Sequence, residues 1–305
     1  PAGWTSHDVV GRLRRLLGER KIGHAGTLDP AATGVLPVAV GDATKTLEYL
    51  TGASKTYLAE ITFGVETDSY DADGRATSIG DQIQLNPSEI ERMLESMLGP
   101  QMQIPPMHSA IKIGGQRLYE AARRGQEIER PARPVVFNEL DLVAWIPPIA
   151  TVLVDCSTGT YVRSLANDLG RMAGCGAHLS GLVRLRSGPF ELCDAWTITE
   201  LSTLAEAGPD SIRERWSTIA IHPDVALMAL PALLLSGEEA IRWQQGKSIP
   251  GPSVEHGVLD AASIRAYDAT GQWIGIGVAD RDPGNWHPKK VVSAPLAIAD
   301  SDVEG

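Results

Sequence analysis

The segment from Lys55 to Phe63 alternates polar and apolar side chains with a period of two. This pattern predicts a β-strand with Tyr57, Ala59, Ile61 and Phe63 on one face. A strand with one apolar face is stable only when another layer covers that face. The chain is therefore expected to fold as a layered structure built on a sheet.

Other segments supply the remaining elements of such a fold. Apolar residues at helical spacing predict helices that begin near Ser6, Asp42, Asn86 and Tyr161. Two more strands are predicted at residues 135–144 and 150–156. Strands that alternate with helices are typical of the α/β and α+β classes.

The chain divides into parts of different character. Residues 101–134 contain Pro105-Pro106, a Gly114-Gly115 turn and several arginines, which indicates an inserted segment with a basic surface. Residues 225–293 alternate short strands with Gly, Asp and Pro turns, as in a small β-barrel. We therefore predict a first domain at 1–223, a second at 224–293 and a loose tail at 294–305.

Length and composition exclude several classes of protein. The chain has 305 residues, with 43% hydrophobic and 21% charged side chains, which is ordinary globular usage. Its longest apolar stretch, residues 225–235, is interrupted by Pro231 and is too short for a membrane helix. Three scattered cysteines suggest reduced thiols, not a disulfide framework or a zinc site. We predict a cytoplasmic protein without a membrane span.

The net charge of −11 is unevenly distributed. Residues 191–305 carry 17 acidic and 8 basic side chains, whereas the earlier part has local clusters of arginine. Such clusters are suited to phosphate contacts, and they are equally typical of solvated helix faces. Charge alone favours the second reading.

Asp29 is the clearest candidate for a catalytic residue. It lies in a Gly-rich segment between Gly26 and Pro30, and an Asp carboxylate can act as a covalent nucleophile on a sugar carbon. An Asp before Pro is also common in a simple turn. The sequence contains no Walker loop, HExxH helix or dinucleotide fingerprint, so it indicates no metal or cofactor.

The string from Gly23 to Leu36, GHAGTLDPAATGVL, resembles the signature of the TruB family of tRNA pseudouridine synthases. Further matches are Lys55-Thr56-Tyr57, Asp71-Ala72-Asp73-Gly74, the segment from Pro105 to Ala110, the segment from Tyr161 to Leu165, and Gly176-Ala177-His178-Leu179. The resemblance covers residues 1 to about 190. It implies a pseudouridine synthase fold with a central mixed, largely antiparallel sheet, followed by a PUA-like RNA-binding barrel.

The resemblance also implies roles for single residues. Asp29 matches the catalytic nucleophile of the family, and Arg163 matches the residue that pairs with it. Tyr57 matches the aromatic residue on which the target base stacks. Without the family, Arg163 reads as a surface ion pair and Tyr57 as a core residue of its strand.

Other positions are implied to bind substrate or RNA. Tyr161 and Leu182 match residues that line the uridine pocket, although both residue types also serve as packing residues. His24 matches the residue that fills the stack left by flipped bases. The insertion coincides with the RNA-gripping segment of the family, so Arg123 and Arg124, together with Arg184, are expected to contact RNA.

The implied function is isomerisation of the uridine at position 55 in the TΨC loop of tRNA, by base flipping and without cofactor or metal. The compact length is similar to that of the bacterial members that act without guide RNA, so we expect tRNA as the partner and a monomer. Three alternatives remain: a guide-dependent synthase, a non-catalytic RNA-binding module, and a glycoside hydrolase that uses Asp29.

Overall fold

The computed structural model describes residues 1–80, 84–109, 111–122, 124–126, 128–206, 208, 211–251, 263–280 and 284–292. The chain forms two compact units. The first comprises residues 1–7, 26–37 and 51–195, and the second comprises residues 8–25, 38–50 and 196–305. The predicted tail lies outside the described residues.

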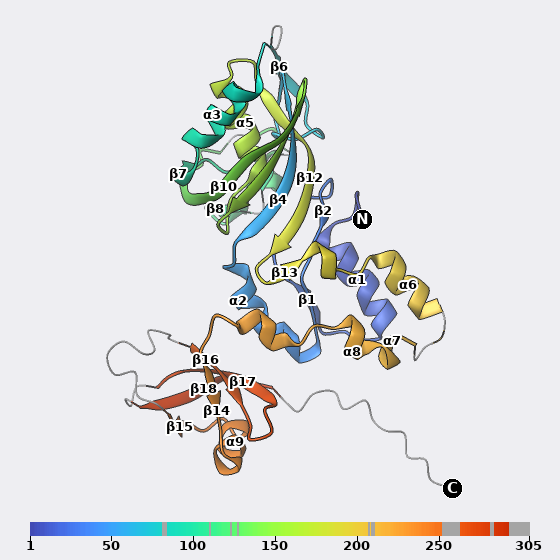
Figure 1. Cartoon of the computed structure of the whole chain (residues 1–305), viewed down its shortest axis with the longest axis vertical. Helices are drawn as coiled ribbons and strands as arrows, with labels where there is room; N and C mark the ends of the chain where they lie inside the picture. Colours follow the sequence, from blue (N-terminus) through green and yellow to red (C-terminus); the bar gives the residue numbers. More distant parts are fainter. Residues whose placement is uncertain are drawn as a thin grey trace. The chain divides into compact units, whose positions relative to one another are not determined.

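The first unit is built on a seven-stranded sheet (Figure 1). Its strands, in order across the sheet, are β13 (Phe190–Glu191), β12 (Ala177–Ser187), β4 (Lys55–Phe63), β11 (Ile149–Cys156), β10 (Arg133–Ile146) and β7 (Gly99–Gln103). These neighbours are antiparallel, and β2 (Thr33–Gly34) pairs in parallel with β12. The predicted mixed, largely antiparallel sheet is confirmed.

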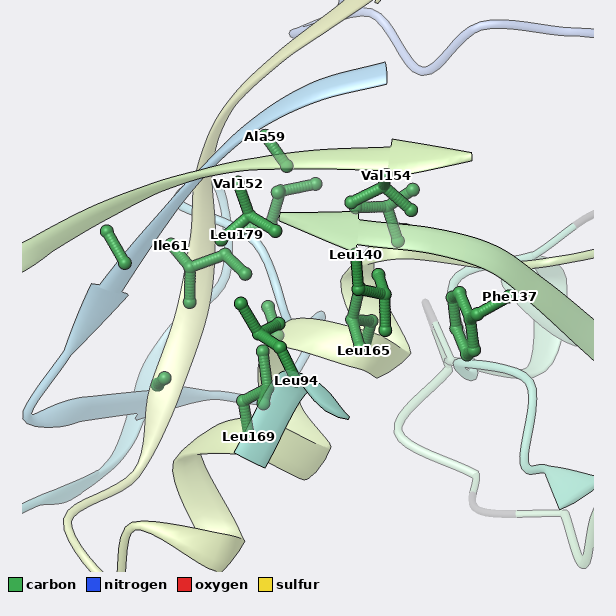
Figure 2. Packing of buried hydrophobic residues seen from close by; sticks show 14 of the residues in the cluster. Ala59, Ile61, Leu94, Phe137, Leu140, Val152, Val154, Leu165, Leu169 and Leu179 are labelled. Atoms are coloured by element: carbon green, nitrogen blue, oxygen red, sulfur yellow. The ribbon is translucent and has the colours of Figure 1, made fainter. Parts of the chain in front are cut away.

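Helices α3 (Pro87–Ser96) and α5 (Val162–Met172) cover one face of this sheet (Figure 2). Ile61, Val152 and Val154 of the sheet pack against Leu94 of α3 and Leu165 of α5. The predicted face of β4 thus contributes to the core. Helix α3 begins with a complete capping box, in which Asn86 and Glu89 each accept from the backbone N–H of the other.

Smaller elements of the first unit lie beyond the main sheet. They are the ladder of β5 (Val65–Thr67) with β6 (Ala76–Ile79), the hairpin of β8 (Lys112–Ile113) with β9 (Gln116–Arg117), helix α4 (Leu118–Ala122) and η2 (Leu192–Asp194). The hairpin turns at the predicted Gly114-Gly115, and α4 follows it directly.

The second unit contains a five-stranded sheet in the order β14 (Ala232–Leu234), β16 (Ser263–Tyr267), β17 (Trp273–Ala279), β18 (Asn285–Val291) and β15 (Ile249–Pro250). Helix α9 (Gly237–Gln244) packs on it through Trp243, which is buried with Trp286. This open barrel agrees with the expected PUA-like domain.

The second unit also takes in early segments of the chain. They are most of α1 (Ser6–Leu17), β1 (Ile22–His24), β3 (Val38–Val40), η1 (Gly41–Thr46) and α2 (Leu47–Thr51), joined by α6 (Ile198–Glu206), α7 (Ser211–Glu214), α8 (Trp216–Ile219) and η3 (Pro223–Leu227). Val10 and Leu13 of α1 pack with Ile198 and Leu201 of α6. The compact units therefore do not divide at residue 223, because contacts between distant segments override chain order. None of the described helices is both long and apolar enough to cross a membrane.

Candidate active site

Asp29 lies in the loop of residues 26–35, which is held by backbone and hydroxyl contacts. The Asp29 carbonyl accepts from the N–H of Ala32 at 2.9 Å, which closes a turn. The N–H of Leu28 donates to the buried hydroxyl of Ser6 at 3.0 Å. Ser6 thus begins α1 and anchors the Asp29 loop as well, a role that the sequence did not indicate.

Arg163 grips the Asp29 carboxylate with two nitrogens. Its Nε lies 3.0 Å from Oδ2, and its Nη2 donates to Oδ1 at 3.1 Å. Arg163 is the second residue of α5, which follows β11 in the chain after a short loop. Its side chain contacts the Asp29 loop. A side-on fork of this kind fixes both the position and the orientation of a carboxylate.

Three further acceptors surround the same guanidinium. Nη1 of Arg163 donates to Oδ2 of Asp71 at 3.2 Å and to the Ser69 carbonyl at 3.4 Å, and Nη2 donates to the His108 carbonyl at 2.9 Å. Asp71 is itself fixed, because its Oδ1 accepts from the Ser69 hydroxyl at 2.5 Å. The arginine therefore joins the Asp29 loop, the turn at residues 67–74 and the inserted segment.

Asp71 is a member of the site that sequence reasoning missed. The segment Asp71-Ala72-Asp73-Gly74 contributed to the family resemblance, yet the acidic residues there also read as an ordinary surface turn. The motif was the available signal. Its pairing with Arg163 is a contact between residues 92 positions apart, which local patterns do not encode.

The electrostatic environment raises the pKa of Asp29. Burial is the largest cause, the negative charge of Asp71 adds to it, and the Arg163 guanidinium opposes both. The Asp29 side chain nevertheless keeps 44% of its surface exposed, whereas that of Arg163 keeps 6%. The carboxyl group is thus enclosed by protein on most sides and open on one, as a group that meets a substrate must be.

Arg184 also holds the Asp29 loop, through hydrogen bonds to its two ends. It is 1% exposed; its Nε donates to the Val35 carbonyl at 2.7 Å and its Nη2 to the Gly26 carbonyl at 3.0 Å. Its positive charge also acts on the Tyr57 phenol and opposes the effect of burial, which raises the pKa of that phenol. A phosphate contact by Arg184 does not fit this burial: the guanidinium ties both ends of the Asp29 loop to β12.

The close fit of the loop explains one of its glycines. At Gly34, with φ at +102°, a Cβ would lie 2.2 Å from the carbonyl oxygen of Arg184. Only a residue without a side chain lets β2 approach β12 so closely. Lys55 is also buried, and its side chain lies next to Gly26. Its Nζ donates to the carbonyls of Thr51 and Ala53.

The aromatic candidates lie within electrostatic range of the same carboxylate. Tyr57 and Tyr161 are both partly buried, burial raises the pKa of both phenols, and the charge of Asp29 acts on each of them. Leu182 lies on β12 opposite Ala59 and packs against the core. The structure thus places Asp29 in contact with Arg163 and within electrostatic range of Tyr57 and Tyr161, with Leu182 on the strand that pairs with that of Tyr57.

The remaining candidates belong to other segments of the chain. His24 ends β1 opposite Val38 of β3, in the second unit. Arg124 is exposed after α4, where its Nε donates to the Glu120 carbonyl. Arg123 lies outside the described residues. Within the described ranges, no cluster of three His, Cys, Asp or Glu residues has the geometry of a metal site.

Known families match the chain over most of its length. Residues 14–162 match the family model described as TruB family pseudouridylate synthase (N terminal domain), and residues 163–241 match the tRNA pseudouridylate synthase B C-terminal domain. Residues 231–292 match Pseudouridine synthase II TruB, C-terminal. A tRNA pseudouridine synthase B of Symbiobacterium thermophilum is 48% identical over 81% of this chain and 79% of its own. The chain belongs to the TruB family of pseudouridine synthases.

Other TruB relatives extend the match to nearly the whole chain. The tRNA pseudouridine synthase B of Dehalococcoides mccartyi is 38% identical over 99% of this chain and 97% of its own. Among solved structures, a Cbf5–Nop10–Gar1 complex gives a TM-score of 0.72 at 25% identity, covering 96% of this chain and 82% of that chain. An archaeal box H/ACA sRNP Nop10–Cbf5 complex gives 0.69 at 22% identity, over 95% and 83%.

Membership of the TruB family defines the reaction. The protein is an isomerase that converts uridine to pseudouridine in tRNA, so the predicted family and enzyme class are confirmed. The glycoside hydrolase and the non-catalytic RNA-binding module are thereby set aside.

Proposed function

We propose that this protein isomerises the uridine at position 55 in the TΨC loop of tRNA, with Asp29 as the nucleophile. The observation that carries the assignment is the Asp29–Arg163 pair, in which a buried guanidinium holds a carboxylate that is open on one side. An enzyme nucleophile needs this combination of a fixed direction and access for the substrate.

The chemistry requires a nucleophile and a pocket, and it requires no electron transfer. The C1′–N1 glycosidic bond breaks, the uracil turns while it stays bound, and a C1′–C5 bond forms. C5 loses a proton and N1 gains one, so the reaction balances without an oxidant or reductant. Arg163 favours the ionised form of Asp29 and aims it.

The pocket residues have complementary tasks in this proposal. The target base, flipped out of the RNA, stacks on Tyr57. Tyr161 and Leu182 limit the space in which the detached uracil turns. His24 replaces the flipped bases in the stack, which offsets part of the cost of unstacking.

RNA contacts outside the pocket complete the proposal. The part of the inserted segment that follows β7 closes over the RNA loop, and Arg123 and Arg124 supply phosphate contacts there. The partner is tRNA alone, the enzyme works as a monomer without guide RNA, and its place of action is the cytoplasm. The 38–48% identity to proteins named tRNA pseudouridine synthase B favours this reading over a guide-dependent one.

The test is pseudouridine mapping on an unmodified tRNA transcript. Wild type and Asp29→Asn are incubated with the transcript in the absence of guide RNA, and modified positions are read by carbodiimide labelling and primer extension. We expect conversion at position 55 by wild type alone. Conversion at another position would overturn the substrate assignment, and turnover by Asp29→Asn would overturn the nucleophile assignment.

A further inference from the structure

Gln103 makes a reciprocal contact with the residue that precedes α5. It is the last residue of β7 and is 4% exposed. Its Oε1 accepts from the Tyr161 N–H at 2.8 Å, and its Nε2 donates to the Tyr161 carbonyl at 3.1 Å. One side-chain amide thus pairs with both backbone polar groups of one residue, as a neighbouring strand would.

This contact supplies what α5 lacks locally. Tyr161 is the N-cap of the helix and makes no side-chain capping hydrogen bond. Its carbonyl accepts from the Leu165 N–H at 3.2 Å, which begins the helical ladder. Because Gln103 holds the N–H and the carbonyl of Tyr161 together, it fixes the direction in which the helix starts. Arg163 follows two residues later.

Two more hydrogen bonds join the same pair of segments. The Ser164 hydroxyl donates to the Ile104 carbonyl at 2.8 Å, and Arg163 donates to the His108 carbonyl at 2.9 Å. Residues 103–108 are the root of the inserted segment. The first turn of α5 and this root are therefore one hydrogen-bonded assembly, and Arg163 connects it to Asp29.

We propose that Gln103 is a positioning residue for the isomerisation, which acts through Tyr161 to set the aim of Arg163 at Asp29. This inference rests on the proposed roles of Asp29 and Arg163. Gln103 does not face the substrate, since it is buried against the backbone of Tyr161. Its contribution is geometric: a small rotation at the start of α5 displaces a guanidinium that has to meet two oxygens at once.

The experiment compares Gln103→Leu with the matched control Gln101→Leu. Gln101 lies on the same strand, and its amide donates to the carbonyl of Ser96 in α3 at 3.5 Å instead of to α5. Single-turnover conversion of a tRNA transcript is measured at saturating enzyme, alongside the dissociation constant for tRNA and the thermal unfolding curve. Rate and affinity are thereby separated.

We expect Gln103→Leu to lower the single-turnover rate at least about tenfold while the tRNA dissociation constant changes less than about twofold. The control should match wild type in both quantities. A rate for folded Gln103→Leu within about twofold of wild type would overturn the proposal. If wild type itself converts no uridine, the proposed function fails, which is a distinct result.

A second variant covers the case in which Gln103→Leu does not fold. Gln103→Glu keeps the acceptor for the Tyr161 N–H but places a carboxylate oxygen against the Tyr161 carbonyl. We expect a folded protein with the same selective loss of rate. If Gln103→Glu turns over at the wild-type rate, or if both variants unfold, Gln103 serves stability alone and the positioning role is wrong.

Discussion

Asp29 and Arg163 form an asymmetric pair, in which the carboxylate side chain is 44% exposed and the guanidinium side chain is 6% exposed. The cation is fully committed to protein acceptors, whereas the anion has one open side. The pair therefore fixes the direction of Asp29 and leaves part of its side chain exposed.

Replacement of Asp29 by Asn should separate chemistry from folding. The site holds two carboxylates and one guanidinium, so Asn at position 29 leaves Arg163 paired with Asp71. We expect loss of detectable isomerisation, unchanged tRNA affinity, and a free energy of unfolding within about 1 kcal/mol of wild type. Chemical denaturation and tRNA binding assays measure the last two. A severe loss of stability would show that the Asp29–Arg163 pair serves the fold.

Replacement of Arg163 by Met should, unlike Asp29→Asn, lower the free energy of unfolding strongly. It leaves Asp29 and Asp71 without their shared cation, and breaking a buried pair from one side costs about 3–5 kcal/mol. The double variant Arg163→Met/Asp71→Asn removes one of the two stranded charges, so it should recover part of that stability and none of the activity. Equal stability of the single and double variants would contradict this account of the charges.

Tyr57 should matter more for turnover than for stability. Tyr57→Phe keeps the ring and loses only the hydroxyl, so we expect most of the single-turnover rate to remain. Tyr57→Ala removes the stacking surface, which is worth about 1–3 kcal/mol per base, and should lower the rate by tenfold or more. If thermal unfolding collapses while the folded fraction of Tyr57→Ala turns over normally, Tyr57 is a core residue.

Arg184 should behave as a structural clamp of the active-site loop. Arg184→Met leaves the carbonyls of Gly26 and Val35 without their donor, at about 1–3 kcal/mol for each unsatisfied group. We expect lower stability together with loss of turnover, and no change in the salt dependence of tRNA binding. Loss of about one unit of the salt slope would instead identify Arg184 as a phosphate contact.

The rate should fall in acid at a higher pH than for an ordinary Asp nucleophile. The pKa of Asp29 is raised by burial and by Asp71, so protonation removes the reactive carboxylate as pH falls through this raised value. A raised pKa in the folded state also means that the stability contribution of protonated Asp29 is lost as pH rises through it. Single-turnover rates measured across acid pH give the acid limb of the pH–rate profile, the range in which the rate falls with pH.

Asp71→Asn tests whether the pKa of Asp29 sets the position of this acid limb. It deletes a negative charge that raises the pKa of Asp29 and leaves the Asp29–Arg163 fork in place. The acid limb should therefore move to lower pH. A limb that stays where it is in wild type would indicate that another group controls it.

Local patterns were sufficient for several elements of the fold. The alternation at residues 55–63 predicted β4 with its bounds, and the helix predicted to begin near Asn86 is α3. Strand β12 was missed, although it adjoins β4 in the sheet. Its register shifts between Leu179 and Gly181 and again between Arg184 and Arg186, and each bulge interrupts the period of two by which a strand is recognised.

The site was less predictable than the strands for a similar reason. The resemblance pointed to Asp29 and Arg163, and the structure places them in contact. Three further contacts were not predictable, because each joins residues many positions apart in the chain. They are those of Arg184 with Gly26, Asp71 with Arg163, and Gln103 with Tyr161. An arginine or glutamine within a motif shows the same local pattern whether it faces solvent or a buried carbonyl.

The composite make-up of the second unit limits how this protein can be shortened. Lys45 donates to the Val291 carbonyl, Glu48 pairs with Lys289 and Lys290, and Tyr49 packs in the cluster with Trp273. A polypeptide ended at residue 223 would expose that apolar surface and deprive Glu48 of Lys289 and Lys290. Removing the C-terminal barrel is therefore not a clean deletion of one module, and any loss of RNA modification in such a truncation would mix recognition with misfolding of the N-terminal segments.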